Sequence, residues 1–470
     1  MDTFLIKAVQ LILAFAFLVI IHEFGHFFFA RIFGVRVEKF YIFFDPWTEL
    51  FKWRPGRYIG GLGKTKKLKG SVKDTPAKGF WKDTEYGIGW LPLGGYCKIS
   101  GMIDESMDTE QMKQPAKEWE FRSKPAWQRL LIMIAGVLFN FLLAIVIYAG
   151  LVYATGEKYV SFRDAKEGMY YSGEARKIGF HNGDIPLLAD GQALGNPAEG
   201  LLKMTQAKEV TVLRQGKETT IKIPSDFMQR LDAEARSDTA MVNFMDYRIP
   251  AQVSQTMNGE GAQKAGILPG DRIIAVDASP TPDIYTFLAT LKGHDNMNVP
   301  VTVVRNMNDT LTLSVSLSGA SKMGIGLETD PSKFFTAKVI EYNLLESVPR
   351  GIKLGTDKLT SYAKSMKLVF TKEGAKSIGG FGAIGSIFPE KWDWIAFWNI
   401  TAFLSVALAF MNILPIPALD GGHVMFLLYE VIFRRKPSEK FMERAQMVGM
   451  FILIGLLLYA NGMDIIRLFK

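Results

Sequence analysis

Four stretches of the chain are apolar for long enough to approach the length of a membrane-crossing helix. They comprise residues 4–30, 130–154, 395–414 and 445–460. The hydrocarbon core of a bilayer is about 30 Å thick, and a helix of about 20 residues crosses it. We therefore predict a multi-pass α-helical membrane protein with four transmembrane helices, whose other segments fold beside the membrane or between the spans.

Basic residues flank three of these spans, and their positions predict the orientation of the chain. Short loops rich in Lys and Arg remain on the cytoplasmic side of a membrane. The flanking residues are Arg31, Arg36 and Lys39 after the first span, Lys124 and Arg129 before the second, and Arg434, Arg435 and Lys436 after the third. Alternating spans then place both termini and the region from about 156 to 394 outside the cytoplasm.

Composition agrees with a membrane protein that carries sizeable polar regions. Hydrophobic residues make up 48% of the 470 residues, and the mean hydropathy is +0.11. A single cysteine, Cys97, excludes an intramolecular disulfide and a Cys-rich zinc site. The net charge of +8 comes with no nucleic-acid-binding motif, so we attribute it to topology and lipid contact. We expect no cleavable signal peptide, because the first apolar stretch lacks a small-residue cleavage site.

The segment between the first two spans mixes aromatic residues, glycines and alternating apolar positions. Residues 40–44 and 90–96 show this pattern most clearly and predict β-hairpin structure close to the membrane. Non-helical backbone at membrane depth must make its hydrogen bonds within the protein, so we expect a re-entrant β element packed on the helices. A basic insertion lies between its halves and contains Lys64, Lys66, Lys67, Lys69 and Lys73. It is interpreted as a solvated loop, with contact to anionic lipid as the alternative.

The region outside the membrane contains two similar signatures, at residues 179–191 and 265–277. Each has a Gly-Asp turn that leads into a predicted strand, which indicates an internal duplication of about 80 to 90 residues per copy. The second copy resembles the PDZ fold closely and the first more loosely. PDZ domains bind extended peptide segments or chain termini at a sheet edge. Two β-rich spacers without ligands are the alternative.

An amphipathic helix is predicted after the second copy. Apolar residues recur there at steps of three to four, with one double step, among basic residues. The apolar set is Val348, Ile352, Leu359, Tyr362, Met366 and Val369. We expect this helix to lie along the outer membrane surface and to join the PDZ-like region to the spans; packing on a PDZ-like domain is the alternative.

The chemistry is concentrated at the end of the first span, in the pentapeptide of residues 22–26. Residues four apart share one helix face, so His22 and His26 present two imidazoles to one tetrahedral zinc. Glu23 stands beside them and can act as the general base on a water molecule. The alternative is a hydrogen-bonded helix interface, but an ionisable cluster within an apolar helix is costly and indicates function.

A zinc site needs a third protein ligand, and the third span offers one where two prolines interrupt it. Asp420 follows Pro415 and Pro417 and precedes two glycines. A broken helix of this kind brings a carboxylate inward at membrane depth. His423 is a competitor for the same role. We favour Asp420 as the ligand and assign His423 to outer-shell contacts or helix packing.

Together these features resemble the site-2 protease family of intramembrane metalloproteases. The motifs that carry the resemblance are the His-Glu-x-x-His helix, the Pro-Leu-Gly-Gly-Tyr strand at residues 92–96, the tandem PDZ-like domains and the Asn-x-x-Pro-x-Pro-x-Leu-Asp-Gly run from residue 412. The resemblance implies a zinc endopeptidase of the bacterial cytoplasmic membrane that cleaves single-pass membrane proteins. A typical substrate is an anti-sigma factor already trimmed by another protease, whose cut fragment is released to the cytoplasm.

The resemblance also assigns roles to residues of this chain. It implies that Asp420 is the third zinc ligand and that Asn412 binds substrate. We expect the strand around 94–98 to hold an extended substrate by β-addition, and the substrate-binding candidates are Asn412, Pro417, Gly94, Gly95, Tyr96 and Asn140. The PDZ-like tandem would admit only substrates whose outer domain has been removed.

The sequence departs from the family pattern at several places. Residues 43–46 read Phe-Phe-Asp-Pro where Gly-Phe-Gly-Pro is usual, residues 135–137 read Ala-Gly-Val where Ala-Gly-Pro is usual, and the Lys-rich insertion is long. None of these positions is a predicted ligand. We therefore expect substrate presentation to differ from that of the family and the zinc chemistry to be the same. The other function classes considered are a non-catalytic membrane scaffold with a structural metal and a transporter, and the absence of an inverted repeat disfavours the transporter.

The predicted organisation has eight parts. They are the first span with the zinc motif (1–34), a cytoplasmic-side membrane-associated β region (35–123), the second span (124–155), two PDZ-like domains (156–248 and 249–333), the amphipathic helix with its connector (334–394), the third span with the Leu-Asp-Gly motif (395–436) and the fourth span (437–470).

Overall fold

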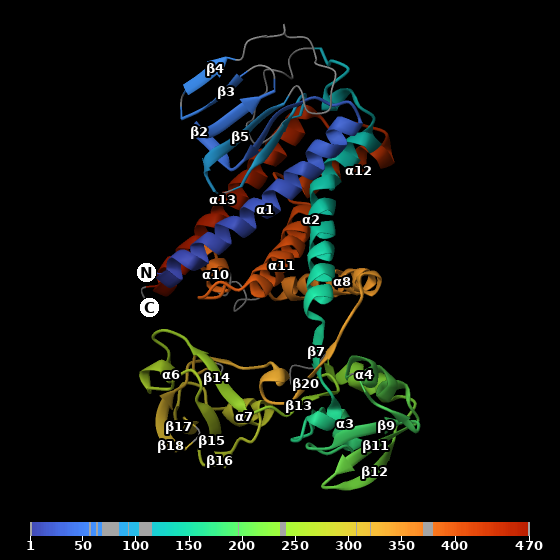
Figure 1. Ribbon diagram of the computed structural model, residues 1–470, viewed down its shortest axis with the longest axis vertical. Coiled ribbons are helices and arrows are strands. Elements are labelled where there is room, and N and C mark those ends of the chain that lie inside the picture. The colour runs from blue at the N-terminus through green and yellow to red at the C-terminus, as the bar shows by residue number, and fades with distance from the viewer. Residues whose placement is uncertain are drawn as a thin grey trace. The chain divides into compact units, whose positions relative to one another are not determined.

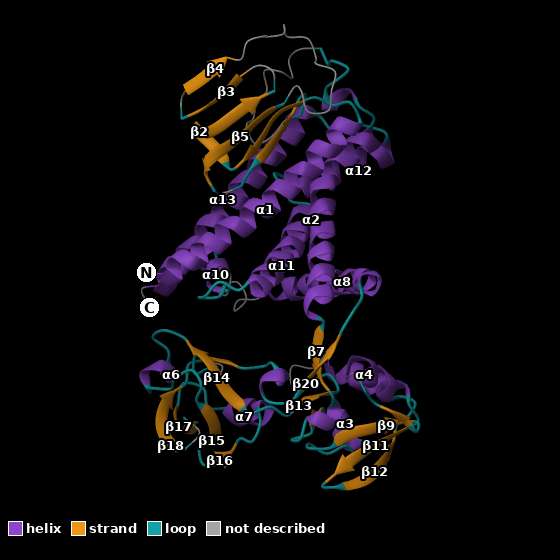
Figure 2. Cartoon of the chain, in the orientation of Figure 1, coloured by secondary structure: helices purple, strands orange, loops and turns teal. Residues whose placement is uncertain are grey.

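The computed structural model describes most of the chain and divides it into two compact units (Figures 1 and 2). Unit 1 joins Met1–Thr155 to Tyr342–Phe469, and unit 2 is Gly156–Glu341. The described residues are 2–55, 58–62, 64–67, 84–92, 94–102, 115–195, 197–235, 241–306, 308–319, 321–369 and 379–468. Leu93, Lys69 and Lys73, which the sequence singled out, lie outside these ranges.

Within the part of unit 1 that the structure describes, four helices are long and apolar enough to cross a membrane. They are α1 (Asp2–Ile32), α2 (Ala126–Thr155), α11 (Trp394–Ile413) and α13 (Glu439–Leu468). The prediction of four such helices is confirmed. Shorter elements accompany them: η2 (Phe121–Ser123), α10 (Phe381–Ser386) and α12 (Asp420–Phe433).

Helix α2 is the centre of unit 1, because α1, α8, α11 and α12 all pack against it. Gly25 of α1 lies at the closest approach: a Cβ there would come within 2.5 Å of the Ala135 carbonyl oxygen of α2. A larger residue at position 25 would hold the two backbones apart. The close approach therefore fixes which residues of α2 face the pentapeptide.

A six-stranded sheet lies beside α1, in the order β4-β3-β2-β5-β1-β6. Its strands are β1 (Val37–Ile42), β2 (Phe44–Arg54), β3 (Tyr58–Gly61), β4 (Lys64–Lys67), β5 (Glu85–Leu91) and β6 (Tyr96–Ile99). The hairpins expected here are only part of the arrangement, since β1 pairs with β5 in parallel and with β6 antiparallel. Residues 64–67 form the edge strand β4, so the prediction of a loop was wrong for this part of the insertion.

The turn between β1 and β2 has an unusual backbone. Phe43 has a φ of 67°, in the left-handed region that glycine adopts more readily than any other residue. This is the position where the family pattern has glycine. Phe43 therefore holds a backbone conformation that costs a residue with a side chain more than it costs glycine.

The amphipathic helix expected after the second copy is α8 (Leu344–Val369), and it packs on α2 and α11. Small residues make the contact: a Cβ on Gly351 would lie 2.7 Å from the Ala149 backbone nitrogen, and one on Gly355 would lie 3.2 Å from Ile145. Val348 and Ile352 remain exposed. Helix α8 therefore packs on the spans through a Gly-x-x-x-Gly face, and part of its predicted apolar face is uncovered.

Unit 2 begins and ends with a strand pair, β7 (Glu157–Val160) with β20 (Ala337–Ile340). Its first half contains η3 (Phe162–Asp164), β8 (Met169–Tyr171), α3 (Gly173–Lys177), β9 (Ile185–Ala189), β10 (Gln192–Ala193), α4 (Pro197–Gln206), β11 (Glu209–Arg214), β12 (Lys217–Lys222), α5 (Phe227–Ala235) and β13 (Met245–Tyr247). These strands form a sheet of order β10-β9-β11-β12 and a β13-β8 pair.

The second half repeats much of this order. It contains β14 (Ala251–Thr256), α6 (Gly261–Lys264), β15 (Arg272–Val276), β16 (Ser279–Pro280), α7 (Ile284–Leu291), β17 (Asn298–Arg305), β18 (Asp309–Ser316), β19 (Ile325–Leu327) and η4 (Pro331–Lys333). Its strands run in the order β18-β17-β15-β14-β19, with β16 paired to β15.

The two halves also share an ion pair at matching positions. Arg214 donates to the Asp184 carboxylate at 2.7 Å and to the Gly179 carbonyl at 2.7 Å. Arg305 makes the same two bonds, to Asp271 and Gly266, at the same distances. Both carboxylates belong to the aspartates of the Gly-Asp turns in the two sequence signatures, so the structure supports an internal duplication.

Candidate metal centre

Three side chains from distant parts of the chain converge in unit 1. His22 and His26 lie one turn apart on α1, and Asp420 is the first residue of α12. The Asp420 Oδ2 atom is 3.0 Å from His22 Nε2 and 3.3 Å from His26 Nε2. The two Nε2 atoms are 3.3 Å apart, and both imidazoles are buried. This is the ligand set that the sequence predicted.

The contacts of this cluster suit a cation. His26 Nδ1 lies 2.8 Å from the Ile132 carbonyl oxygen, which can only accept, so Nδ1 donates there and Nε2 is the ring atom that faces Asp420. The Asp420 Oδ2 atom is buried, and the groups that face it are the two imidazoles. Ligand atoms about 2.0–2.1 Å from a tetrahedral zinc are about 3.3 Å apart, which matches the spacings found here.

Asn140 of α2 contacts the other nitrogen of His22. Its side-chain amide lies 3.2 Å from His22 Nδ1, and the residue is fully buried. Its Oδ1 has no partner as placed, so turning the amide over would let Oδ1 accept a proton from Nδ1 and leave Nε2 free. At this position Asn140 can orient the imidazole of His22. Its contact with substrate stays a prediction.

The interruption of the third span places Asp420. Helix α11 ends at Ile413, and a turn with Ala418 at a φ of 75° leads into α12. Gly421 allows the turn to close tightly, because a Cβ there would come within 2.0 Å of the Leu414 carbonyl oxygen. The competitor His423 lies 2.8 Å from Gln446 of α13 and is not part of the cluster.

Glu23 is half-buried beside the cluster. It interacts electrostatically with His22, His26 and Asp420, and its carboxylate lies at the backbone N–H of Cys97 in β6. A carboxylate in this position can receive a proton from a water molecule held between it and the three ligand atoms.

The other predicted substrate contacts surround this point. Gly94, Gly95 and Tyr96 lead into β6, which is an edge strand of the sheet. Gly95 is pressed against α1, since a Cβ there would lie 2.7 Å from Val19. Asn412, at the end of α11, has its amide nitrogen 3.3 Å from His22 Nε2. Asn412 therefore contacts a predicted ligand, and Gly95 packs on α1 about one turn before His22.

Pro417 is placed differently from the other candidates. Its carbonyl oxygen faces α13, where a Cβ on Gly449 would come within 1.9 Å of it. Pro417 therefore packs the loop before α12 against the fourth span. This contact with α13 helps to hold the loop that precedes Asp420.

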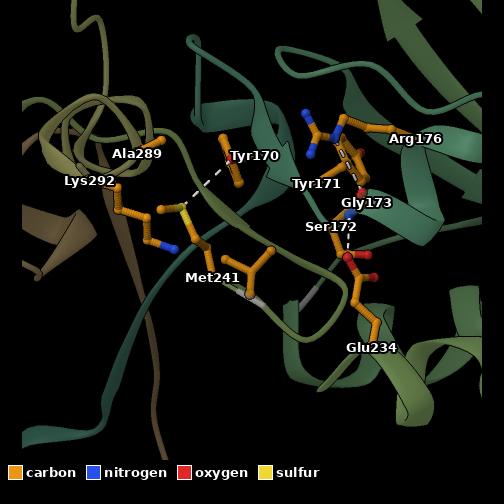
Figure 3. A pocket seen from close by; sticks show the side chains of 10 residues that line it. Tyr170, Tyr171, Ser172, Gly173, Arg176, Glu234, Met241, Ala289 and Lys292 are labelled. Atoms are coloured by element: carbon orange, nitrogen blue, oxygen red, sulfur yellow. Dashed lines mark hydrogen bonds between the residues drawn. The ribbon is translucent and has the colours of Figure 1, made fainter. Parts of the chain in front are cut away.

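Unit 2 contains a polar pocket of about 210 Å³ (Figure 3). Arg176, Glu234 and Lys292 contribute its charged groups. The Glu234 carboxylate accepts from the backbone N–H groups of Gly173 and Glu174, at 2.7 and 3.0 Å. This pocket is not a candidate metal site. Among the described residues, the one group of side chains placed to hold a metal ion is the cluster of His22, His26 and Asp420 in unit 1.

Sequence reasoning missed how α2 contacts the histidines. The Ile132 carbonyl accepts from His26, Asn140 contacts His22, and Gly136 lies against both rings. Asn140 was predicted only as a substrate contact, and Gly136 entered only as part of the Ala-Gly-Val departure from the family pattern. A polar Asn inside an apolar span was a signal for a partner of the metal site. The Ile132 carbonyl has no pattern that could have marked it.

Comparison with known proteins gives the family. The model of peptidase family M50 matches residues 10–59 and 73–456. A putative zinc metalloprotease of Xylella fastidiosa is 28% identical over 95% of this chain and 96% of its own length. The regulator of sigma E protease of Haemophilus influenzae is 26% identical, over 99% of this chain and all of its own length. Metalloprotease MmpA of Caulobacter vibrioides is 24% identical, over 99% and 96%. The chain therefore belongs to peptidase family M50, the site-2 protease family, and is a zinc metalloprotease of a membrane.

Proposed function

We propose that this protein is an intramembrane endopeptidase whose zinc is held by His22, His26 and Asp420. The observation that carries the proposal is the convergence of three metal-ligating side chains, two buried imidazoles and a half-buried carboxylate, at spacings of 3.0 to 3.3 Å. A zinc ion held there supplies Lewis acidity to a peptide carbonyl and lowers the pKa of a water molecule.

The residues around the ligands have distinct roles in this proposal. Glu23 takes the proton of the attacking water and passes it to the leaving amine. Asn140 and the Ile132 carbonyl hold the two imidazoles in the tautomer that leaves Nε2 free. Asn412, 3.3 Å from His22 Nε2, donates to the backbone of the bound peptide.

The substrate must be locally extended at the cut, because a helix keeps its carbonyl groups in internal hydrogen bonds. An extended segment can add to β6, which is an edge strand among the described residues, beside Cys97 and Glu23. Gly94, Gly95 and Tyr96 would line its path. The sheet thus acts as a re-entrant element that presents the peptide to the catalytic carboxylate.

Unit 2 fits two tandem PDZ-like domains, since its halves share an element order and the Asp–Arg pair. The basic flanks of the spans favour placing unit 2 on the outer side of the bacterial cytoplasmic membrane. There it would select single-pass membrane proteins whose outer domain has been removed. The Haemophilus relative is named a regulator of sigma E protease, which supports an anti-sigma factor as the substrate class.

Glu23→Gln tests the assignment in the purified, reconstituted protein. We expect zinc content near that of the wild type and cleavage of a single-pass substrate reduced by at least 10³-fold, of the order lost when a catalytic group is removed. Glu341→Gln, at an exposed position, is the matched control and should cleave normally. Retained proteolysis by the Glu23 variant would show that another group activates the water.

A further inference from the structure

The sheet of unit 1 has two chemically different faces. On one of them the side chains pair with each other: Tyr41 donates to Glu85 at 2.7 Å, and Tyr96 donates to Asp45 at 2.9 Å. Lys52 and Glu49 form an ion pair at 2.6 Å on the same face. This face is polar, and its charges are balanced locally.

The opposite face is apolar and begins on α1. Phe27 of α1 lies 5.6 Å from Phe40 and 6.3 Å from Tyr86, measured between ring centroids. Tyr86 in turn lies 5.9 Å from Trp53 of β2. A continuous row of aromatic rings thus runs from the membrane-spanning helix to the outer strands of the sheet.

Beyond α1 the side chains on this same face are exposed. The register pairs Phe51 with Ile88 and Trp53 with Ile59, so these side chains share one side of the sheet. Trp47 stacks on Trp90 at 5.8 Å. We call these residues the aromatic face: Trp47, Phe51, Trp53, Ile59, Ile88 and Trp90. Trp47 is 85% exposed, and the others are 37% to 42% exposed.

Two lysines of the edge strand belong to the aromatic face. Lys66 pairs with Ile59 and Lys64 pairs with Gly61, which places both lysines on the aromatic side of the pleat. Both are exposed. Lys64 and Lys66 therefore form a basic rim at the outer border of the aromatic face.

We propose that the aromatic face is inserted in the interfacial layer of the membrane and that Lys64 and Lys66 bind the headgroups of anionic phospholipids. Tryptophan is enriched at this depth of the bilayer, because its ring is apolar and its N–H is polar. Each lysine near an anionic leaflet strengthens the electrostatic attraction between the protein and the membrane surface. The face is continuous with α1, so the bilayer that surrounds α1 is the occupant already adjacent to it.

Insertion of the aromatic face would hold the sheet at a constant depth in the membrane. It would thereby hold the edge strand β6 beside the metal centre. The inference rests on the membrane placement of α1 and does not depend on the catalytic roles proposed above. Loss of the lipid contact and loss of zinc chemistry can therefore be measured separately. Lipid contact is measured by the quenching of a fluorescent dye on the sheet, and zinc chemistry by the metal content of the protein.

Site-directed fluorescence on the full chain in lipid nanodiscs tests the proposal. In a Cys97→Ser background, Trp53→Cys and Ile59→Cys place an environment-sensitive dye on the aromatic face. Lys52→Cys, one residue away in the same strand, places it on the polar face. We expect a nitroxide on the lipid to quench the first two dyes at least threefold more than the third, and aqueous iodide to show the reverse. Because two positions on the aromatic face carry the dye, the test still gives a result if one of the two variants fails to fold.

The lipid charge is tested by comparing phosphatidylcholine nanodiscs with discs that also contain phosphatidylglycerol. Quenching at position 59 should rise with the anionic lipid, and Lys64→Gln with Lys66→Gln should remove that rise. Equal quenching on the two faces would overturn the insertion. An unchanged response in the lysine variant would overturn the headgroup contact. Protection from both quenchers that grows with protein concentration in detergent would show that a second copy covers the face instead.

Discussion

Gly136 of α2 lies directly against His26 of α1. A Cβ on Gly136 would come within 2.4 Å of His26 Nε2 and 2.7 Å of the nearest ring atom of His22. We therefore expect Gly136→Ala to push the imidazoles away from Asp420 and to lower zinc affinity at least tenfold. Competition with a calibrated chelator measures the affinity on the purified protein.

Gly150, in the same helix, provides the control for this substitution. A Cβ there meets nothing within 4 Å. Gly150→Ala should leave zinc affinity unchanged and raise stability slightly, by about 0.5–1 kcal/mol at most, since alanine favours the helix. An equal loss of zinc affinity in both variants would mean that any glycine-to-alanine change in α2 weakens zinc binding. The specific contact between Gly136 and His26 would then be refuted.

Asn140 is expected to act on zinc affinity through His22. Asn140→Leu removes the partner of Nδ1, and we expect a 10- to 100-fold loss of zinc affinity, as found for outer-shell partners of metal ligands. Asn140→Asp keeps an acceptor at the same place and should retain most of the affinity. If the Leu variant binds zinc normally and loses only substrate affinity, Asn140 contacts the peptide after all.

Much of unit 1 follows from local pattern. The length of the apolar stretches predicted α1, α2, α11 and α13, and the four-residue spacing placed His22 and His26 on one helix face. Asp420 could be predicted because two prolines end the third span before it. Each of these signals lies within about ten residues of the feature that it predicts.

The remaining contacts depend on how distant segments pack. Asn140 and Gly136 face the histidines because Gly25 lets α2 approach at Ala135, and no local pattern encodes that register. The parallel pairing of β1 with β5 joins strands more than 40 residues apart, whereas hairpin rules consider only neighbours. Lysines are rare in central strands, yet an edge strand such as β4 accepts them.

Arg129 and Glu430 join α2 to α12 through a partly buried ion pair at 2.5 Å. Glu430 lies on the helix that begins with Asp420, so the pair helps to fix that helix. We expect Glu430→Gln to leave an uncompensated charge and to destabilise unit 1 by about 3–5 kcal/mol, with a loss of zinc affinity. Thermal unfolding in detergent, with and without zinc, measures both effects.

A double variant distinguishes the effect of the buried charges from the effect of side-chain shape on the packing of α12. Replacing both partners by apolar residues, as Arg129→Met with Glu430→Leu, removes the buried charges together and should cost much less than the single change. Zinc affinity should then return toward that of the wild type. If the double variant is as unstable as Glu430→Gln, the packing of α12 depends on shape and not on the ion pair.

The Asp271–Arg305 pair predicts how the stability of the second half of unit 2 depends on pH. Hydrogen bonds from Arg305 to the carboxylate, at 2.7 and 2.8 Å, hold the pKa of Asp271 below its ordinary value. A folded-state pKa below the unfolded value of about 3.9 contributes stability that is complete above that value and is lost as the pH falls through the folded pKa.

Arg305→Gln should therefore destabilise this half by about 2–3 kcal/mol at pH 7, because it leaves a buried carboxylate with one strong donor fewer. The difference from the wild type should shrink as the pH falls below about 4, where the carboxylate of the variant is protonated. Hydrogen exchange of the amides in β15 and β17, corrected for the intrinsic rate at each pH, measures it on the intact protein. Arg272→Gln, at an exposed neighbouring position, should show no such change. A difference that stays constant down to pH 3 would assign the effect to the packing of Arg305, because a charge-dependent contribution must disappear once the Asp271 carboxylate is neutral.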